Sequence, residues 1–79
     1  MPLISGSNSL DTDFTPSVGQ FIASASRGDA VLLRANASGA DYSIVGTVNG
    51  AVIVDNPIAG AIYRWARSGN TTATVRADQ

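Results

Sequence analysis

The stretch YSIVGTVNGAVIVD, residues 42–55, places Asn49-Gly50 between two runs rich in Val and Ile. Asn-Gly suits a two-residue type I′ turn, because both central residues of that turn need a positive φ. The sequence therefore predicts a tight hairpin made of residues 42–48 and 51–55. Its cross-strand pairs would be Val48 with Ala51, Gly46 with Ile53, and Ile44 with Asp55.

Both faces of this predicted hairpin are apolar. One face would hold Val45, Thr47, Val52 and Val54, and the other Ile44, Gly46, Val48, Ala51 and Ile53. A hairpin with one solvated face alternates apolar and polar residues, so this one needs cover on each side. A chain this short supplies one core. We therefore expect the second apolar face, with Ile44, Val48 and Ile53, to meet the N-terminal segment, another copy or another protein.

In the rest of the chain, turn-forming residues are spaced as they are in a small all-β domain. Short runs of Val, Ile and Thr are interrupted by Gly, Asn, Asp and Pro about every eight to twelve residues. The predicted strands are 18–25, 30–37, 42–48, 51–55, 61–67 and 71–77, with turns at 27–29, 38–41 and 56–60. We expect one antiparallel β-sandwich or barrel of about six strands over residues 17–79.

The final two predicted strands can be aligned by their faces. A loop at 68–70, closed by Arg67 opposite Thr71, would pair Trp65 with Ala73 and Tyr63 with Val75. This register separates an apolar set from a polar one, which a slip of one residue would mix. The inner set is Ala61, Tyr63, Trp65, Ala73 and Val75, and the outer set includes Arg64, Thr72, Thr74 and Arg76.

Residues 1–16 show no sustained period of 2 or 3.6 and are rich in Ser, Asn and Asp. We expect an extended N-terminal arm. Its isolated apolar residues are the candidate anchors on a partner: Leu3, Ile4, Leu10 and Phe14.

The composition removes most catalytic chemistry. The 79 residues include no Cys, His, Lys or Glu, so every charged side chain is one of five Arg or six Asp. The commonest general base, the thiolate nucleophile and the usual soft metal ligands are therefore missing. Asp11 and Asp13 could bind a hard cation, but they also suit solvated or turn-capping positions. We expect no enzyme activity, no metal and no cofactor.

Charge and hydropathy also limit the partners. A net charge of −1 does not attract polyanions, and no apolar run approaches the roughly 18 to 20 residues of a membrane span, so we expect neither nucleic-acid nor membrane binding. Arg64 and Arg76 could contact a phosphate or an acidic group of a protein partner, or they are solvated, and we expect a protein partner or solvent rather than nucleic acid. Tyr42, Tyr63 and Trp65 could form a sugar-stacking platform, although the predicted register turns the last two into the core.

Six short segments between residues 30 and 77 follow one another in a pattern of strands and Gly-containing turns. They are Ala30-Val31-Leu32-Leu33-Arg34, Ser38-Gly39-Ala40-Asp41-Tyr42, Val45-Gly46-Thr47, Pro57-Ile58-Ala59-Gly60, Tyr63-Arg64 and Ser68-Gly69-Asn70-Thr71-Thr72-Ala73-Thr74-Val75. Over these segments the chain resembles small β-sandwich proteins of tailed-phage virions, notably capsid cement or decoration proteins and related head or tail modules. Tyr42 stands where that pattern has Trp, and Ile58 interrupts a Pro-Ala-Gly turn.

The resemblance implies a noncatalytic subunit on the capsid surface of the virion. Such a subunit binds the major capsid protein or a neighbouring virion protein, often as a homo-oligomer, and bridges subunits without a small-molecule substrate. The alternative is a recognition module of a tail or head fibre that binds a cell-surface carbohydrate or protein. Exposure of Trp65 separates the two, because a sugar platform needs that ring in water.

Overall fold

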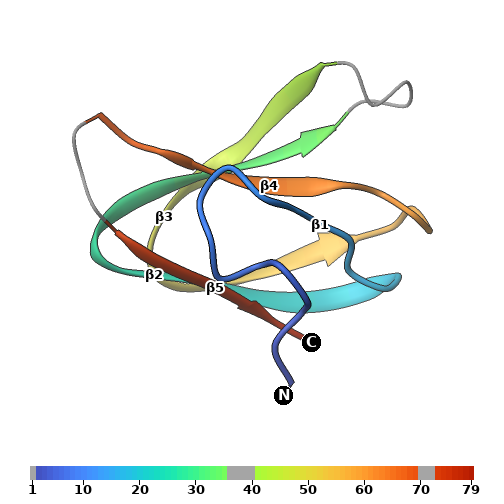
Figure 1. The fold of residues 1–79 in the computed structure, drawn as a ribbon. Coiled ribbons are helices and arrows are strands. Elements are labelled where there is room, and N and C mark those ends of the chain that lie inside the picture. The colour runs from blue at the N-terminus through green and yellow to red at the C-terminus, as the bar shows by residue number, and fades with distance from the viewer. Residues whose placement is uncertain (1, 36–40, 70–72) are drawn as a thin grey trace.

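The computed structural model describes residues 2–35, 41–69 and 73–79, and these form an all-β domain of antiparallel strands. The predicted fold class is confirmed, and the described residues contain no helix. The described part of the chain has five strands, and Figure 1 shows how they are arranged in space. They are β1 (Asp13–Phe14), β2 (Gly19–Ala35), β3 (Tyr42–Asn56), β4 (Tyr63–Arg67) and β5 (Thr74–Asp78).

Two long strands, β2 and β3, form a ribbon that bends in the middle (Figure 1). Pairing runs from Gly19 opposite Asn56 to Ala35 opposite Tyr42, and it is interrupted where residues 26–29 of β2 face Asn49 alone. A wide irregularity of this kind bends a ribbon sharply and lets each half belong to a different layer. The backbone of the bend has positive φ at Arg27 (64°), Gly28 (139°) and Gly50 (93°).

The predicted turn at Asn49-Gly50 is therefore wrong, because the chain bends there and does not reverse. Val48 pairs with Ala30 of β2 and not with Ala51, and Ile44 pairs with Leu33. Asn49 is not among the described residues other than Gly that have a positive φ, whereas a type I′ turn needs one there. The 17 residues of β2 supply a partner along the whole of 42–56, so the two predicted strands join into one.

The predicted pairing of the last two strands is also wrong. β4 pairs with the second half of β2, where Trp65 lies opposite Leu32, while β5 pairs with the first half, where Val75 lies opposite Ala25. Both strands thus lie along the same side of β2, before and after its bend. The predicted pair of Arg67 with Thr71 and the loop residue Asn70 fall outside the described residues.

The face assignment of those strands nevertheless holds, because Tyr63, Trp65, Ala73 and Val75 are all buried. They pack with alternate residues of β2 and with Val48 of β3 in a single core. Phe14, Phe21 and Tyr63 form an aromatic cluster, with ring centroids 5.2 to 6.3 Å apart. Since Phe21 lies in the first half of β2 and Tyr63 pairs with the second half, the cluster joins the two layers.

Residues 2–16, predicted as an extended arm, lie against β4 and β5 of their own domain. The amide of Ile4 donates to the carbonyl of Ala77 at 2.9 Å, Leu3 bridges Asp78, and the amide of Asp11 donates to the carbonyl of Trp65. β1 then pairs with β4. The segment fills the gap between the edges of β4 and β5, which places the two chain ends side by side (Figure 1).

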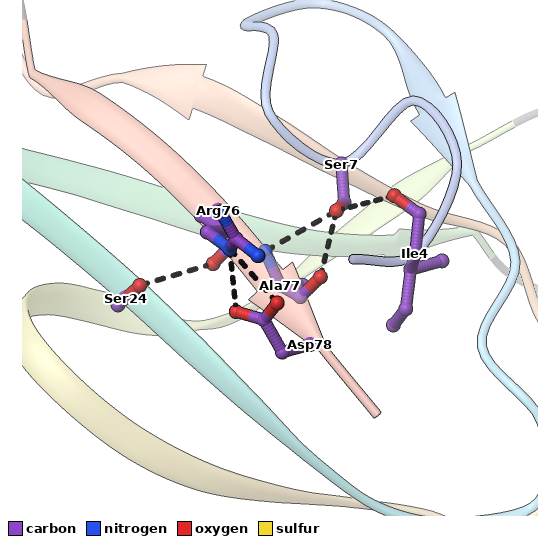
Figure 2. A network of polar contacts seen from close by, with 6 residues as sticks. All are labelled: Ile4, Ser7, Ser24, Arg76, Ala77 and Asp78. Atoms are coloured by element: carbon purple, nitrogen blue, oxygen red, sulfur yellow. Dashed lines mark hydrogen bonds and ion pairs between the residues drawn. The ribbon is translucent and has the colours of Figure 1, made fainter. Parts of the chain in front are cut away.

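The Ser7 side chain hydrogen-bonds the N-terminal segment to β5, as Figure 2 shows. Its hydroxyl is fully buried, lies 2.7 Å from the carbonyl oxygen of Ile4 and 2.9 Å from that of Ala77, and accepts the amide of Ala77 at 3.2 Å. One serine oxygen therefore serves a turn of the N-terminal segment and both polar groups of a β5 residue. The two carbonyl oxygens also accept backbone amides, those of Ser7 and Ile4, so losing the hydroxyl would leave only the buried amide of Ala77 unpaired.

Gly50→Ala tests the bend. A Cβ at Gly50 would meet no atom within 4 Å, so the expected loss of about 1 to 2 kcal/mol comes from the positive φ alone. Gly46→Ala in the same strand is the matched control, since it also meets nothing but lacks a positive φ. Urea denaturation of both variants checks this, and equal effects would contradict it.

Ser7→Ala should lower the free energy of unfolding by about 1 to 3 kcal/mol, because it leaves the buried amide of Ala77 without a hydrogen-bond partner. Ser9→Ala, in the same turn segment but exposed, should change it by less than about 0.5 kcal/mol. Denaturant titration followed by tryptophan fluorescence gives both values. A Ser7 variant as stable as the Ser9 variant would show that the N-terminal segment is not fastened there.

Candidate functional site

The outer face of the β2–β3 ribbon carries two exposed isoleucines, one on each side of the bend, and we call these and their neighbours on β2 the apolar strip. Ile44 is 72% exposed and Ile53 is 69% exposed. Each lies beside a partly buried aliphatic residue of β2: Ile44 pairs with Leu33, and Ile53 pairs with Ile22. Phe21 and Leu32, the preceding neighbours in β2, are fully buried, which turns Ile22 and Leu33 outward.

Val48, predicted to share this second apolar face, is instead buried in the core. The prediction failed because the chain does not reverse at 49–50, so Val48 and Ile53 lie five positions apart in one strand and point to opposite faces. Ile44 faces outward because β3 has a bulge at Val45, where Leu32 pairs with Gly46 but Leu33 pairs with Ile44. Such a bulge shifts the alternation by one residue.

The N-terminal segment does not cover this strip. Phe14 is buried in the core, so its predicted role as an anchor on a partner is wrong: its own domain uses the ring. Ile4 and Leu10 are partly buried and pack against the same core. Leu3 is 38% exposed and is the most accessible of the four predicted anchors.

Arg64 belongs to a surface cluster across three strands. Its Nε lies 2.7 Å from Oδ1 of Asp13 on β1, and its guanidinium lies 4.7 Å from the ring centroid of Tyr42 on β3. The Tyr42 hydroxyl donates to the same Asp13 oxygen at 3.0 Å. The charge of Arg64 is thus already paired with a carboxylate of the same chain.

These contacts set the protonation of the cluster. The hydrogen bond from Arg64 holds the pKa of Asp13 below its ordinary value, and the one from Tyr42 adds to this. Desolvation and then the hydrogen bond to Asp13 raise the pKa of Tyr42, while Asp13 raises the pKa of Arg64. The cluster therefore keeps its ionic form near neutral pH.

Arg76 is likewise held by an acid of its own strand. Its Nε lies 2.8 and 2.9 Å from the two carboxylate oxygens of Asp78, while its side chain remains 55% exposed (Figure 2). Arg64 and Arg76 do not sit on one paired hairpin, because their strands pair with different halves of β2. A partner that used either Arg would compete with these acids.

The aromatic platform considered for sugar binding does not exist in the described structure. Tyr63 and Trp65 have no exposed surface, and the hydroxyl of Tyr63 donates to Oδ1 of the buried Asn56 at 3.3 Å. The Trp65 ring is therefore not accessible for stacking on a sugar. Its Nε1 has no hydrogen-bond partner among the described residues.

Asp11 and Asp13 do not converge on a cation. Asp13 faces Arg64, and residues 2–35, 41–69 and 73–79 hold no group of three acids or other ligands suited to a metal. The turn predicted at residues 27–29 is wrong as a strand reversal, because Arg27-Gly28-Asp29 lies in the bend of the continuous strand β2, where Asp29 accepts a hydrogen bond from Asn49 at 2.7 Å. None of the described elements is a helix able to cross a membrane.

Sequence reasoning missed the hollow beside β3. Val45 and Val52 are 43% and 40% exposed, and they help to line an open depression of about 400 Å³ inside the bend of the strand. Both residues were expected on the core side of a closed hairpin. The depression is lined by Leu32, Val45, Gly46, Thr47, Val48, Val52, Ile53, Val54 and Asp55.

Comparison with protein-family models, curated proteins and solved structures finds no match for this chain.

Arg64→Gln should raise the pKa of Asp13 toward its ordinary value of 3.8, because the largest cause of the depression is removed. A depressed carboxyl pKa stabilises the fold above the unfolded-state pKa, and this contribution is lost as pH falls through the folded-state pKa. The variant should therefore lose less stability on acidification. Carboxyl-detected NMR titration measures the pKa, and Arg67→Gln on the same strand should leave it unchanged.

Proposed function

We propose that this protein is a non-enzymatic structural subunit of a tailed-phage virion, most specifically a cement or decoration subunit on the capsid surface. The observation that carries the proposal is the exposed apolar strip on the outer face of the ribbon. A single 79-residue domain that leaves Ile44 and Ile53 in water has a surface suited to being covered.

The mechanism is burial of this strip against the major capsid protein or a neighbouring virion protein. Complete burial of a large aliphatic side chain contributes about 1.5 to 3 kcal/mol, and a specific interface buries roughly 1,600 Å² in total. Repetition over a lattice adds avidity without new contacts when subunits are linked to one another.

Four further features support an assembly subunit. Trp65 and Tyr63 are buried in the core, so these large aromatic rings stabilise the domain itself and are not exposed to a ligand. The conspicuous surface charges, Arg64 and Arg76, are paired with Asp13 and Asp78 of the same chain. The resemblance over residues 30–77 supplies the virion setting, and the near-neutral charge suits contacts made by apolar area.

Co-sedimentation with capsids that lack small accessory proteins tests the proposal. The double variant Ile44→Ser/Ile53→Ser should weaken binding by at least about tenfold, since two buried side chains contribute more than 1.4 kcal/mol. Ile58→Ser is the matched control, because Ile58 is 53% exposed but lies in the turn after β3. Failure of the wild-type chain to sediment with any capsid of its phage, or equal binding by all variants, would contradict the proposal.

A further inference from the structure

The outer edge of β3 is a free strand edge. Within residues 2–35, 41–69 and 73–79, β3 pairs with β2 alone, so its other side has no strand beside it over Tyr42–Asn56. Alternate residues of an edge strand direct unpaired N–H and C=O groups outward, which is a template for another strand. Natural edges are usually blunted by Lys, Pro or inward charge.

β3 carries none of these three protections, although its bulge at Val45 is a further feature that can twist an edge away from a partner. Residues 42–54 contain no charged residue and no Pro, and the first charge is Asp55, near the end of the strand. The side chains along the edge are apolar and exposed, including Ile44, Val45 and Ile53. An edge this long and this apolar favours a strand partner that is itself uncharged.

We infer that this edge pairs antiparallel with β3 of a second copy, around a two-fold axis at Asn49, to give a dimer with one continuous sheet. The first argument is the bend. An axis at Asn49, along the local normal of the sheet, places the bend of one strand against the bend of its partner, with both copies concave toward the same side. A register far from Asn49 would set a bent strand against a straight one.

The second argument is that the faces match. Opposed residues in an antiparallel pair lie on the same face. An axis at Asn49 sets Thr47 opposite the partner copy's residue 51, and both positions face outward, since they pair with Val31 and Ser24 of β2. It also sets the inward-facing Gly46 opposite residue 52 of the other copy.

The bulge at Val45 keeps apolar residues of the two copies opposite each other beyond Gly46. Beyond Gly46, the two residues Ile44 and Val45 together occupy one position, as they do opposite Leu33 of β2. Residue 53 of the second copy then faces this bulge, so isoleucine meets isoleucine and valine on both sides of the axis. An axis at Gly50 would set Asp55 against the same apolar bulge, which would desolvate a charge.

The open space at Gly46 and the depression along β3 favour the same register. Gly46 has open space where a Cβ would stand, and the depression inside the bend lies along this edge. A valine at position 52 of the second copy would lie over Gly46. The dimer would also join the two apolar strips, bringing Ile44 of one copy beside residue 53 of the other.

The inference goes beyond the proposed function, because purified protein alone reports it. Light scattering should give twice the 8.1 kDa of the chain over a range of micromolar concentrations. Hydrogen exchange of the wild-type protein should show protected amides at successive residues from 46 to 52, whereas a free edge protects alternate ones. A monomer, or open-ended aggregates without a defined dimer, would overturn the inference.

Cysteine cross-linking tests the register, since the chain has no native Cys. Thr47→Cys/Ala51→Cys should form a covalent dimer on mild oxidation, because each thiol lies opposite the other position. Each single variant should stay uncross-linked, since identical positions would be about 14 Å apart along the paired strands, beyond the roughly 7 Å limit for a disulfide. Cross-linking of Thr47→Cys alone would overturn the register.

The two proposals fail separately. A monomer that still binds capsids through Ile44 and Ile53 would overturn the dimer and leave the virion role standing. A dimer that binds no capsid in the co-sedimentation test would overturn the virion role and leave the β3 pairing standing. Circular dichroism of each Cys variant confirms that the sheet is intact before cross-linking is scored.

Discussion

The bend of the β2–β3 ribbon is the constraint on which the rest of the structure depends. Because Arg27, Gly28 and Gly50 adopt positive φ at one level, a single pair of strands serves two layers. β4 docks on β2 after the bend and β5 before it, and their inward side chains meet around Tyr63 and Trp65. Without the bend, a flat ribbon would have no second layer on which to bury its apolar side.

The same bend leaves β3 on the outside. β2 is paired on both sides, with β3 on one and with β4 and β5 on the other, whereas β3 has β2 alone among the described strands. The N-terminal segment closes the gap between β4 and β5, and Ser7 fastens it by buried hydrogen bonds. One side of the domain is therefore sealed within the chain, and the opposite side ends in an uncharged edge. This asymmetry is the physical basis of both proposals.

Much of the fold was predictable, and the failed hairpin has a clear physical cause. Short β-branched runs with Gly, Asn and Asp between them predicted an all-β domain, and alternation correctly turned Tyr63, Trp65 and Val75 inward. The hairpin at Asn49-Gly50 failed because local preference for positive φ does not distinguish a reversal from a bend. That choice depends on the partner strand, and 17 residues of β2 favour one continuous β3. For the candidate site, Ile44 and Ile53 were identified, but Val48 and Phe14 were assigned to a partner although the core takes them.

The sequence by itself determined which reactive side chains are missing from this chain and that the chain folds into β-strands. Without Cys, His, Lys or Glu it has few groups for catalysis, and its two-sided apolar strands require cover beyond a simple hairpin. Only the tertiary structure decided which apolar residues remain in water. A bulge at Val45 and a bend at Asn49 each change the face that later residues present, and both arise from long-range pairing of β2 with β3. The exposed surface therefore depends on contacts between residues far apart in the chain, which no local pattern encodes.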